Sequence, residues 1–192
     1  MNAVLLELEN HAYPTISISH KPLDVGKNII VDLPRCAKSI YKQILVGAYQ
    51  AETEYVAMCE DDCFYVPEHF LYRPKHFGYN LNRWSLHLRE KVFSYRERPV
   101  MSQCIAKRQS LIDTLEERFA LPDLPEALCG EPGRLEHTLK LTEYGFETFK
   151  TDMPNLVVCH NKGTFGIKRM GGSPTVYLDG LGNANTWVEK LT

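Results

Sequence analysis

The sequence predicts an α/β fold: one domain in which a mostly parallel sheet is flanked by helices. The chain has 192 residues, of which 44% are hydrophobic, enough to bury a single sizeable core. Short apolar runs typical of buried strands alternate with longer segments whose apolar residues recur at helical spacing. One such helical segment joins two of the apolar runs, and this order favours a parallel, right-handed crossover.

Five elements are predicted in the first third of the chain. The strands are short apolar or alternating runs, and each helix repeats apolar residues on one face. Pro14 ends the first helix, and Asp32 with Pro34 closes the second strand. The predicted elements are a helix over 3–12, strands over 15–19 and 29–31, a helix over 37–51 and a strand over 54–58.

Fewer elements are predicted in the remainder of the chain. Polar and aromatic residues mix over 71–100, which predicts irregular structure with one candidate strand over 91–98. Apolar residues at helical spacing predict helices over 104–119 and 134–145, the second ending at Gly145. A buried strand is expected over 156–159, and it opens into a basic loop rich in glycine.

The composition narrows the class of protein. No apolar run approaches the roughly 20 residues that span a bilayer, so no membrane association is expected. The N-terminal stretch lacks the basic region and cleavage site of a signal peptide, and a cytoplasmic location is the expectation. The six cysteines form no CxxC pair, which favours reduced core thiols over a structural zinc site.

Positive charge is concentrated over residues 71–110. This segment holds nine lysines and arginines against two acids, together with six aromatic residues. Such a mixture suits a polyanion, either a diphosphate or a strand of nucleic acid. A solvated basic surface whose aromatic residues face the core explains the same pattern, so both interpretations stay open.

Three consecutive acids follow the strand predicted over 54–58. In the stretch MCEDDCFYVPEHF, the residues Glu60, Asp61 and Asp62 come directly after an apolar run. Adjacent carboxylates repel one another, so they need either solvent or a cation. Ligands of parallel α/β sheets gather beyond the carboxyl ends of the strands, where this acid triplet is expected. The acid triplet is therefore either a solvated turn or a metal site.

The surrounding sequence resembles a known enzyme family. The stretch AETEYVAMCEDD resembles the A-x-G-x-Y-hydrophobic-acid-x-Asp signature of glycosyltransferases with the GT-A fold, and Gly47 falls where that signature has a glycine. Glu60 and Asp62 take the outer positions of the family's D-x-D motif. The stretches ISHKPLDVGKNIIVD and SIYKQILVGAYQA are similar to a phage and bacterial branch of family-2-like enzymes. The resemblance covers residues 10–170 and implies a single GT-A-like, Rossmann-like domain, located in the bacterial cytoplasm if it is phage-encoded.

The resemblance implies a divalent cation, Mn²⁺ or Mg²⁺, that bridges carboxylates and the diphosphate of a nucleotide-sugar donor. Asp62 is then the first choice as direct ligand, with Glu60 as a second ligand, while Glu60 and Asp61 also bind through water or contact the ribose. A histidine after the last strand often completes the site in the family, and His160 stands there, although it could simply cap the strand. Three basic residues of the following loop are candidates for holding the diphosphate: Lys162, Lys168 and Arg169.

The family's catalytic base is harder to locate. It belongs to an acidic pair that precedes a helix ending in glycine, and counting back from Gly145 places this pair on Gly133 and Arg134. Glu131 and Glu136 flank that gap and are the candidates. Glu131 is narrowly favoured because its loop could swing toward an acceptor; either residue could instead be an acid stabilised by the helix dipole.

The chain departs from the family at its start, where the first nucleotide-binding strand is missing. The loop SHKPLDVGKN is the expected replacement, with Lys21 for phosphate and Asp24 for ribose. The predicted function is metal-dependent transfer of a hexose from a UDP-sugar to a hydroxyl acceptor, with a 5-hydroxymethylpyrimidine in DNA as one candidate. The alternative is a non-catalytic nucleotide- or cation-binding module that has lost part of the donor site.

Overall fold

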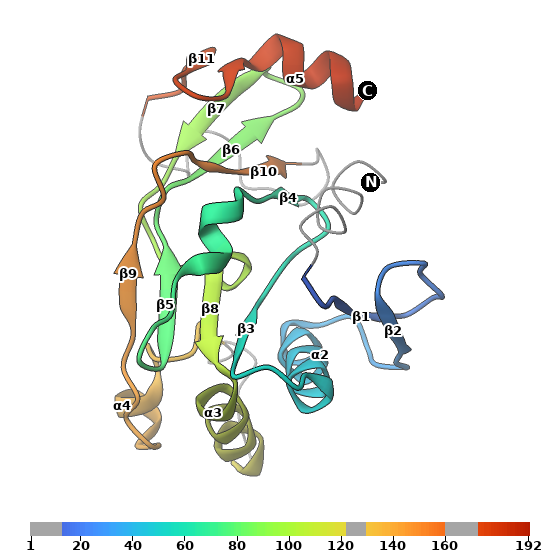
Figure 1. The fold of residues 1–192 in the computed structure, drawn as a ribbon, viewed down its shortest axis with the longest axis vertical. Coiled ribbons are helices and arrows are strands. Elements are labelled where there is room, and N and C mark those ends of the chain that lie inside the picture. Colours follow the sequence, from blue (N-terminus) through green and yellow to red (C-terminus); the bar gives the residue numbers. More distant parts are fainter. Residues whose placement is uncertain (1–12, 122–129, 160–172) are drawn as a thin grey trace.

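The computed structural model describes residues 13–121, 130–159 and 173–192 and shows a mixed α/β fold (Figure 1). Two four-stranded sheets lie one above the other along the long axis of the molecule. The lower sheet has the order β3-β8-β5-β9, with strands Tyr55–Ala57, Cys104–Lys107, Phe77–Asn80 and Glu147–Phe149. The upper sheet has the order β4-β10-β6-β7, with strands Cys63–Phe64, Asn155–Cys159, Arg83–His87 and Val92–Tyr95.

Helices cover both sheets. Two of them, α2 and α3, pack on the lower sheet, whereas α5 packs on the upper sheet. The helices of the described ranges are α2 (Ala37–Gln50), α3 (Arg108–Ala120), α4 (Glu136–Leu139) and α5 (Ala184–Leu191), with 3-10 turns η1 (Pro67–Leu71) and η2 (Met101–Gln103). None of the helices in these ranges is long and apolar enough to cross a membrane.

The first two predicted strands and the helix after them are confirmed, and the strands form a small sheet of their own. Strands β1 (Ile16–Ser19) and β2 (Lys27–Ile30) pair in parallel. Gly26 directly precedes β2 in a conformation that favours glycine: its φ is +55°, and a Cβ there would lie 2.2 Å from the Thr15 carbonyl oxygen. The helix predicted over 3–12 lies outside the described residues. A second small sheet pairs β11 (Tyr177–Leu178) with β12 (Gly182–Asn183).

The mostly parallel sheet of the prediction is not what the described residues form. Five of their eight strand pairs are antiparallel. The predicted crossover through α2 is wrong, because β3 does not join β1 and β2 but pairs antiparallel with β8, Tyr55 opposite Lys107. A helix of this length can connect two separate sheets as well as two strands of one sheet. The coarser prediction of an α/β protein is confirmed.

Three predicted segments differ in detail. Residues 71–100 contain β5, β6 and β7, of which only β7 was a candidate strand. The helix predicted over 104–119 begins at Arg108, since its first four residues form β8 and a run buried on both faces carries no period. The helix predicted over 134–145 is reduced to α4, which ends before Lys140, whose φ is +54°. The strand over 156–159 is confirmed as β10.

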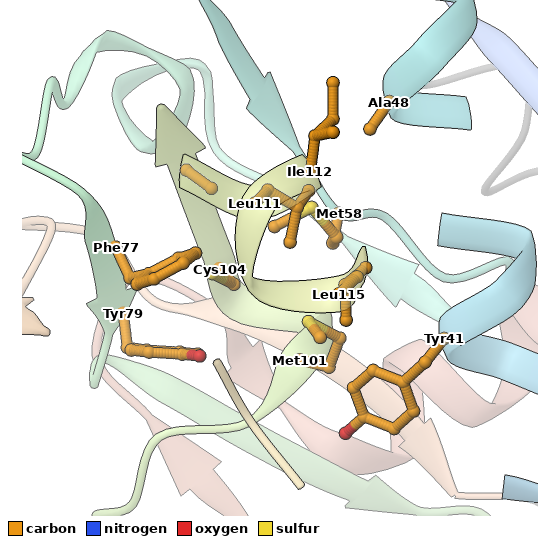
Figure 2. Packing of buried hydrophobic residues seen from close by; sticks show 11 residues of the cluster. Tyr41, Ala48, Met58, Phe77, Tyr79, Met101, Cys104, Leu111, Ile112 and Leu115 are labelled. Carbon is orange, nitrogen blue, oxygen red and sulfur yellow. The ribbon is translucent and has the colours of Figure 1, made fainter. Parts of the chain in front are cut away.

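Two hydrophobic clusters stabilise the fold. The larger joins α2 and α3 to the lower sheet, and Figure 2 shows Leu111 and Leu115 of α3 between the sheet residues and Tyr41 of α2. The smaller packs α5 against Leu86, Phe93 and neighbouring residues of the upper sheet. Each fully buried leucine or phenylalanine contributes about 1.5–3 kcal/mol.

The two sheets are joined through Asn155. This residue begins β10 of the upper sheet and is fully buried. Its side chain donates to the Gln103 amide oxygen over 2.6 Å and accepts from the Val66 backbone N–H over 2.9 Å. Gln103 directly precedes β8 of the lower sheet, so one amide side chain connects both sheets to the chain that leaves the acid triplet.

Candidate functional site

The acid triplet Glu60, Asp61 and Asp62 lies in the turn between β3 and β4, where the chain passes from the lower to the upper sheet. Tyr65 holds the beginning of the turn. Its buried hydroxyl accepts a hydrogen bond from the Glu60 backbone N–H over 3.0 Å and donates to the Ser102 carbonyl over 2.9 Å.

The other end of the turn is bound to the upper sheet. The Asp62 carbonyl accepts from the Val158 N–H of β10 over 2.7 Å, and the Cys63 N–H closes the turn on the Glu60 carbonyl over 3.2 Å. The backbone of the acid triplet is therefore anchored on both sides.

Glu60 and Asp62 converge as predicted, and the structure adds Cys63 to them. The carboxylate oxygens and the thiol of these three residues all lie within 4.8 Å of one another, and we call them the acid–thiol group. Asp61 is exposed and lies outside it. The carboxylate oxygens suit Mn²⁺ or Mg²⁺, whereas the thiol suits softer ions. Exposed acidic groups of this kind are also common without an ion.

The folded structure raises the pKa values of Glu60 and Cys63. Burial of its carboxyl group raises the pKa of Glu60 from 4.5 to about 7, with further contributions from Asp62 and Asp61, while Arg83 opposes the rise. Glu60 is nevertheless exposed as a residue, so solvent screening reduces the free energy attached to this shift. Burial also raises the pKa of the Cys63 thiol, and the Asp62 and Glu60 charges raise it further. Both shifts favour the protonated forms of Glu60 and Cys63.

The acid–thiol group adjoins a buried polar face of the upper sheet, which sequence periodicity did not reveal. Strand register places Cys63, Arg83 and Ser85 on the same side of the sheet. Ser94 and His87 continue this face, and the His87 ring Nε2 lies 2.8 Å from the Ser94 hydroxyl oxygen. We call these residues, together with Asn155 and Cys159, the polar face. Buried serines and histidines look like loop residues in a sequence, which explains why β6 was not predicted.

The candidate donor residues Lys21 and Asp24 lie in the exposed connection between β1 and β2. This connection is organised locally, since Asn28 accepts from the Leu23 N–H and donates to Ser17 and Ser19. No contact of Lys21 or Asp24 with the acid triplet occurs among the described residues. The structure does not bring this part of the predicted donor site to the acids.

Glu131, the favoured base, has a fixed backbone. Buried Arg118 of α3 donates to the Gly130 carbonyl over 2.7 Å and to the Glu131 carbonyl over 3.4 Å. The Tyr79 hydroxyl donates to the next carbonyl, of Pro132, over 2.6 Å. The expected swing of this loop is therefore limited to the side chain, and the Glu131 carboxylate pairs with Arg134 over 2.8 Å.

Several other candidates cannot be placed. Glu136 is the first residue of α4, but its side chain is not described. Four predicted ligands of the metal or the diphosphate lie outside the described residues: His160, Lys162, Lys168 and Arg169.

The basic segment 71–110 does not form one continuous surface. Lys75 and Lys107 lie around His76 at the start of β5, whereas Arg89 and Lys91 lie at the turn between β6 and β7, at the opposite end of the molecule. Its aromatic residues are largely internal: Phe77, Tyr79 and Phe93 are fully buried. This arrangement favours the interpretation of a solvated basic surface over a single nucleic-acid stripe.

A surface hollow of about 500 Å³ lies elsewhere, between the end of β2, α2 and the end of α3. Val31, Leu45 and Phe119 give it an apolar lining, and none of its lining residues belongs to the acid–thiol group. The hollow is therefore separate from the acid–thiol group.

No protein-family model, no curated protein and no solved structure matches this chain.

Proposed function

We propose that this protein is a metal-dependent glycosyltransferase that moves a hexose from a UDP-sugar to a hydroxyl acceptor. The observation that carries the proposal is the convergence of Glu60 and Asp62 at an anchored turn between two sheets. The sequence around this turn resembles the family-2-like GT-A enzymes, in which two such acids hold a divalent ion.

The chemistry of the donor supports the same assignment. When a sugar leaves UDP, negative charge builds on the diphosphate, and a divalent cation held by carboxylates stabilises it. Glu60 and Asp62 supply hard oxygen ligands, which suit Mn²⁺ or Mg²⁺. Glu131 is the proposed base that removes the proton of the acceptor hydroxyl, and Glu136 is the alternative. Before it acts, the Glu131 carboxylate has to leave Arg134.

The test is a pair of isosteric variants within the triplet. Asp62→Asn should abolish Mn²⁺-dependent transfer from a panel of UDP-sugars, scored by mass spectrometry of DNA and glycan acceptors. Asp61→Asn is the matched control, because it removes the same charge from the adjacent exposed residue outside the acid–thiol group, and it should retain transfer. Full transfer by Asp62→Asn would remove the assignment.

The salt dependence of turnover distinguishes a DNA acceptor from a glycan or small-molecule acceptor. A 5-hydroxymethylpyrimidine in DNA would be approached through phosphate contacts, so its turnover should fall steeply as salt rises. Turnover of a glycan or small-molecule acceptor should hardly respond. The division of the basic residues between two ends of the molecule favours the second outcome.

A second candidate is a non-catalytic nucleotide- or cation-binding module. It is favoured by the position of Lys21 and Asp24, which lie on a separate two-stranded sheet with no contact to the acids among the described residues. A module of this kind should be stabilised against heat by Mn²⁺ and UDP together, yet turn over none of the sugar donors. The enzyme should show both stabilisation and turnover.

A further inference from the structure

Among the described residues, the charged side chain of Arg83 has no partner. It is the first residue of β6 and is partly buried. No hydrogen bond or ion pair of its guanidinium occurs within the described ranges, and its Nε atom is shielded from solvent with no acceptor. Burying an unpaired donor on a charged group is costly, so its retention calls for an explanation.

Strand register places Arg83 on the same face of the upper sheet as Cys63 of the acid–thiol group. Cys63 of β4 and Ser85 of β6 both pair with Val157 of β10, so the two side chains project from the same face. Arg83 precedes Ser85 by two residues and shares that face. Two strand spacings, about 10 Å, separate β4 from β6, and Arg83 lies two residues, about 7 Å, along β6 from the level of Cys63, so a gap remains between the arginine side chain and the acids of the turn.

Electrostatics agree with this placement. Burial lowers the pKa of Arg83, while the nearby Cys63, Cys159 and Glu60 act against that change and Arg98 adds to it. Arg83 in turn lowers the pKa of Glu60. The guanidinium and the Glu60 carboxylate therefore feel each other's charge, although no ion pair joins them in the described part of the chain.

We propose that Arg83 binds the diphosphate of the nucleotide ligand, which lies between the guanidinium and a cation held by the acid–thiol group. This inference rests on the proposed function. A guanidinium offers parallel N–H donors that match two phosphate oxygens, and its charge remains at any physiological pH. The anion would supply the acceptor that Nε lacks and would separate two positive charges. Arg83 thus adds a ligand-binding residue from the middle of a sheet to those expected in the loop after β10.

Binding, rather than activity, tests this role. Calorimetry on the full chain at about pH 8, where Glu60 is mostly ionised, would measure Mn²⁺ alone, then UDP at saturating Mn²⁺, then inorganic pyrophosphate at saturating Mg²⁺. Arg83→Gln should weaken UDP and pyrophosphate by about tenfold or more. It should leave Mn²⁺ affinity unchanged or tighter, because it removes a like charge near the cation. Arg83→Lys should recover part of the loss.

The matched control is Arg98→Gln, which removes the same charge from an exposed neighbour, and it should change UDP affinity by less than about threefold. Arg83→Gln should also melt no earlier than the wild type, since it removes an unpaired buried charge. A lower melting temperature with intact UDP affinity would assign Arg83 a structural role and overturn the inference.

Binding of UDP and pyrophosphate by the wild type and the variants distinguishes a wrong role for Arg83 from a wrong proposed function. If Asp62→Asn loses Mn²⁺ and UDP but Arg83→Gln keeps both, only the inference falls. If the wild type binds no UDP with Mn²⁺, the proposed function falls, and the inference then depends on a loss of pyrophosphate binding in Arg83→Gln. Absence of pyrophosphate binding as well would overturn it. Loss of affinity for a single-stranded DNA oligonucleotide, with UDP unaffected, would also contradict it.

Discussion

Tyr65 fixes the position of Glu60 through the backbone: its hydroxyl accepts from the Glu60 N–H over 3.0 Å while it donates to the Ser102 carbonyl over 2.9 Å. Ser102 belongs to η2, which leads into β8 of the lower sheet. A single buried phenol therefore sets where the acid triplet stands relative to that sheet.

Tyr65→Phe should destabilise the protein. The variant keeps the ring but leaves two buried backbone groups without this partner, which costs about 1–3 kcal/mol of unfolding free energy. It should also weaken Mn²⁺ binding, because the turn that carries Glu60 loses its support. Urea denaturation and a Mn²⁺ titration check both effects. Tyr72→Phe is the control: its hydroxyl donates to the Glu147 carboxylate at the surface, and its loss should cost less than about 0.5 kcal/mol.

The pKa of Glu60 predicts a pH dependence for the cation. A carboxyl group whose pKa is raised to about 7 must lose its proton before it can bind a metal ion. Mn²⁺ affinity should therefore rise with pH up to about 7 and then level off, with release of one proton for each ion bound below that pH. Glu60→Gln should bind Mn²⁺ more weakly and flatten the profile. A wild-type affinity that does not vary between pH 5 and 7 would contradict this assignment.

The raised pKa of Glu60 also predicts how the stability of the protein changes with pH. Because the folded pKa lies above the unfolded value of 4.5, the folded state favours the protonated acid, and this contribution is complete below about pH 4.5. It is lost as the pH rises through about 7. Glu60→Gln should then be more stable than the wild type above pH 7, by about 1 kcal/mol after solvent screening, and similar below pH 4.5. Thermal unfolding at several pH values measures the difference.

Cys63 predicts a preference among metal ions. Its thiol lies within 4.8 Å of both carboxylates and is fully buried, so a soft ion such as Cd²⁺ should gain a sulfur ligand that Mn²⁺ does not need. Cys63→Ser should weaken Cd²⁺ by about tenfold or more and Mn²⁺ by less than about threefold. Cys36→Ser, directly before α2 and outside the group, should change neither. Equal losses for both ions would show that the thiol is no ligand.

The conformation of Gly26 predicts that the stability of the β1–β2 sheet depends on a glycine at this position. An alanine Cβ there would lie 2.2 Å from the Thr15 carbonyl oxygen, in addition to the strain of a positive φ. Gly26→Ala should therefore cost about 2 kcal/mol or more. Gly182→Ala is the matched control: its φ is also positive, but nothing lies within 4 Å of the added Cβ, so only the backbone strain of about 1–2 kcal/mol applies. Chemical denaturation compares the two.

Elements with a clear period could be predicted from the sequence. Helix α2 has a face of apolar residues, and β10 is a continuous apolar run. Which strands pair is a property of long-range contacts and not of local pattern. The pairing of Tyr55 with Lys107 joins residues far apart in the chain, so the assignment of β3 to a separate sheet could not be read from the segment itself.

Only the part of the candidate site that is formed by neighbouring residues of one turn could be predicted from the sequence. Glu60 and Asp62 converge because they flank one residue in a tight turn. Arg83 comes from another strand and shares its face with the polar residues Ser85 and His87, whose burial is not evident from their residue types. The signal that could have found it is the isolated basic residue at the start of a run with apolar Trp84 and Leu86 at alternate positions.

The double contact of Asn155 bears on how the chain can be divided. Since its amide reaches Gln103 beside one sheet and Val66 behind the acid triplet, separating the two sheets would leave buried hydrogen-bonding groups unpaired. The chain also passes between the two sheets several times, so no single cut assigns one sheet to each fragment, and neither sheet is expected to fold without the other.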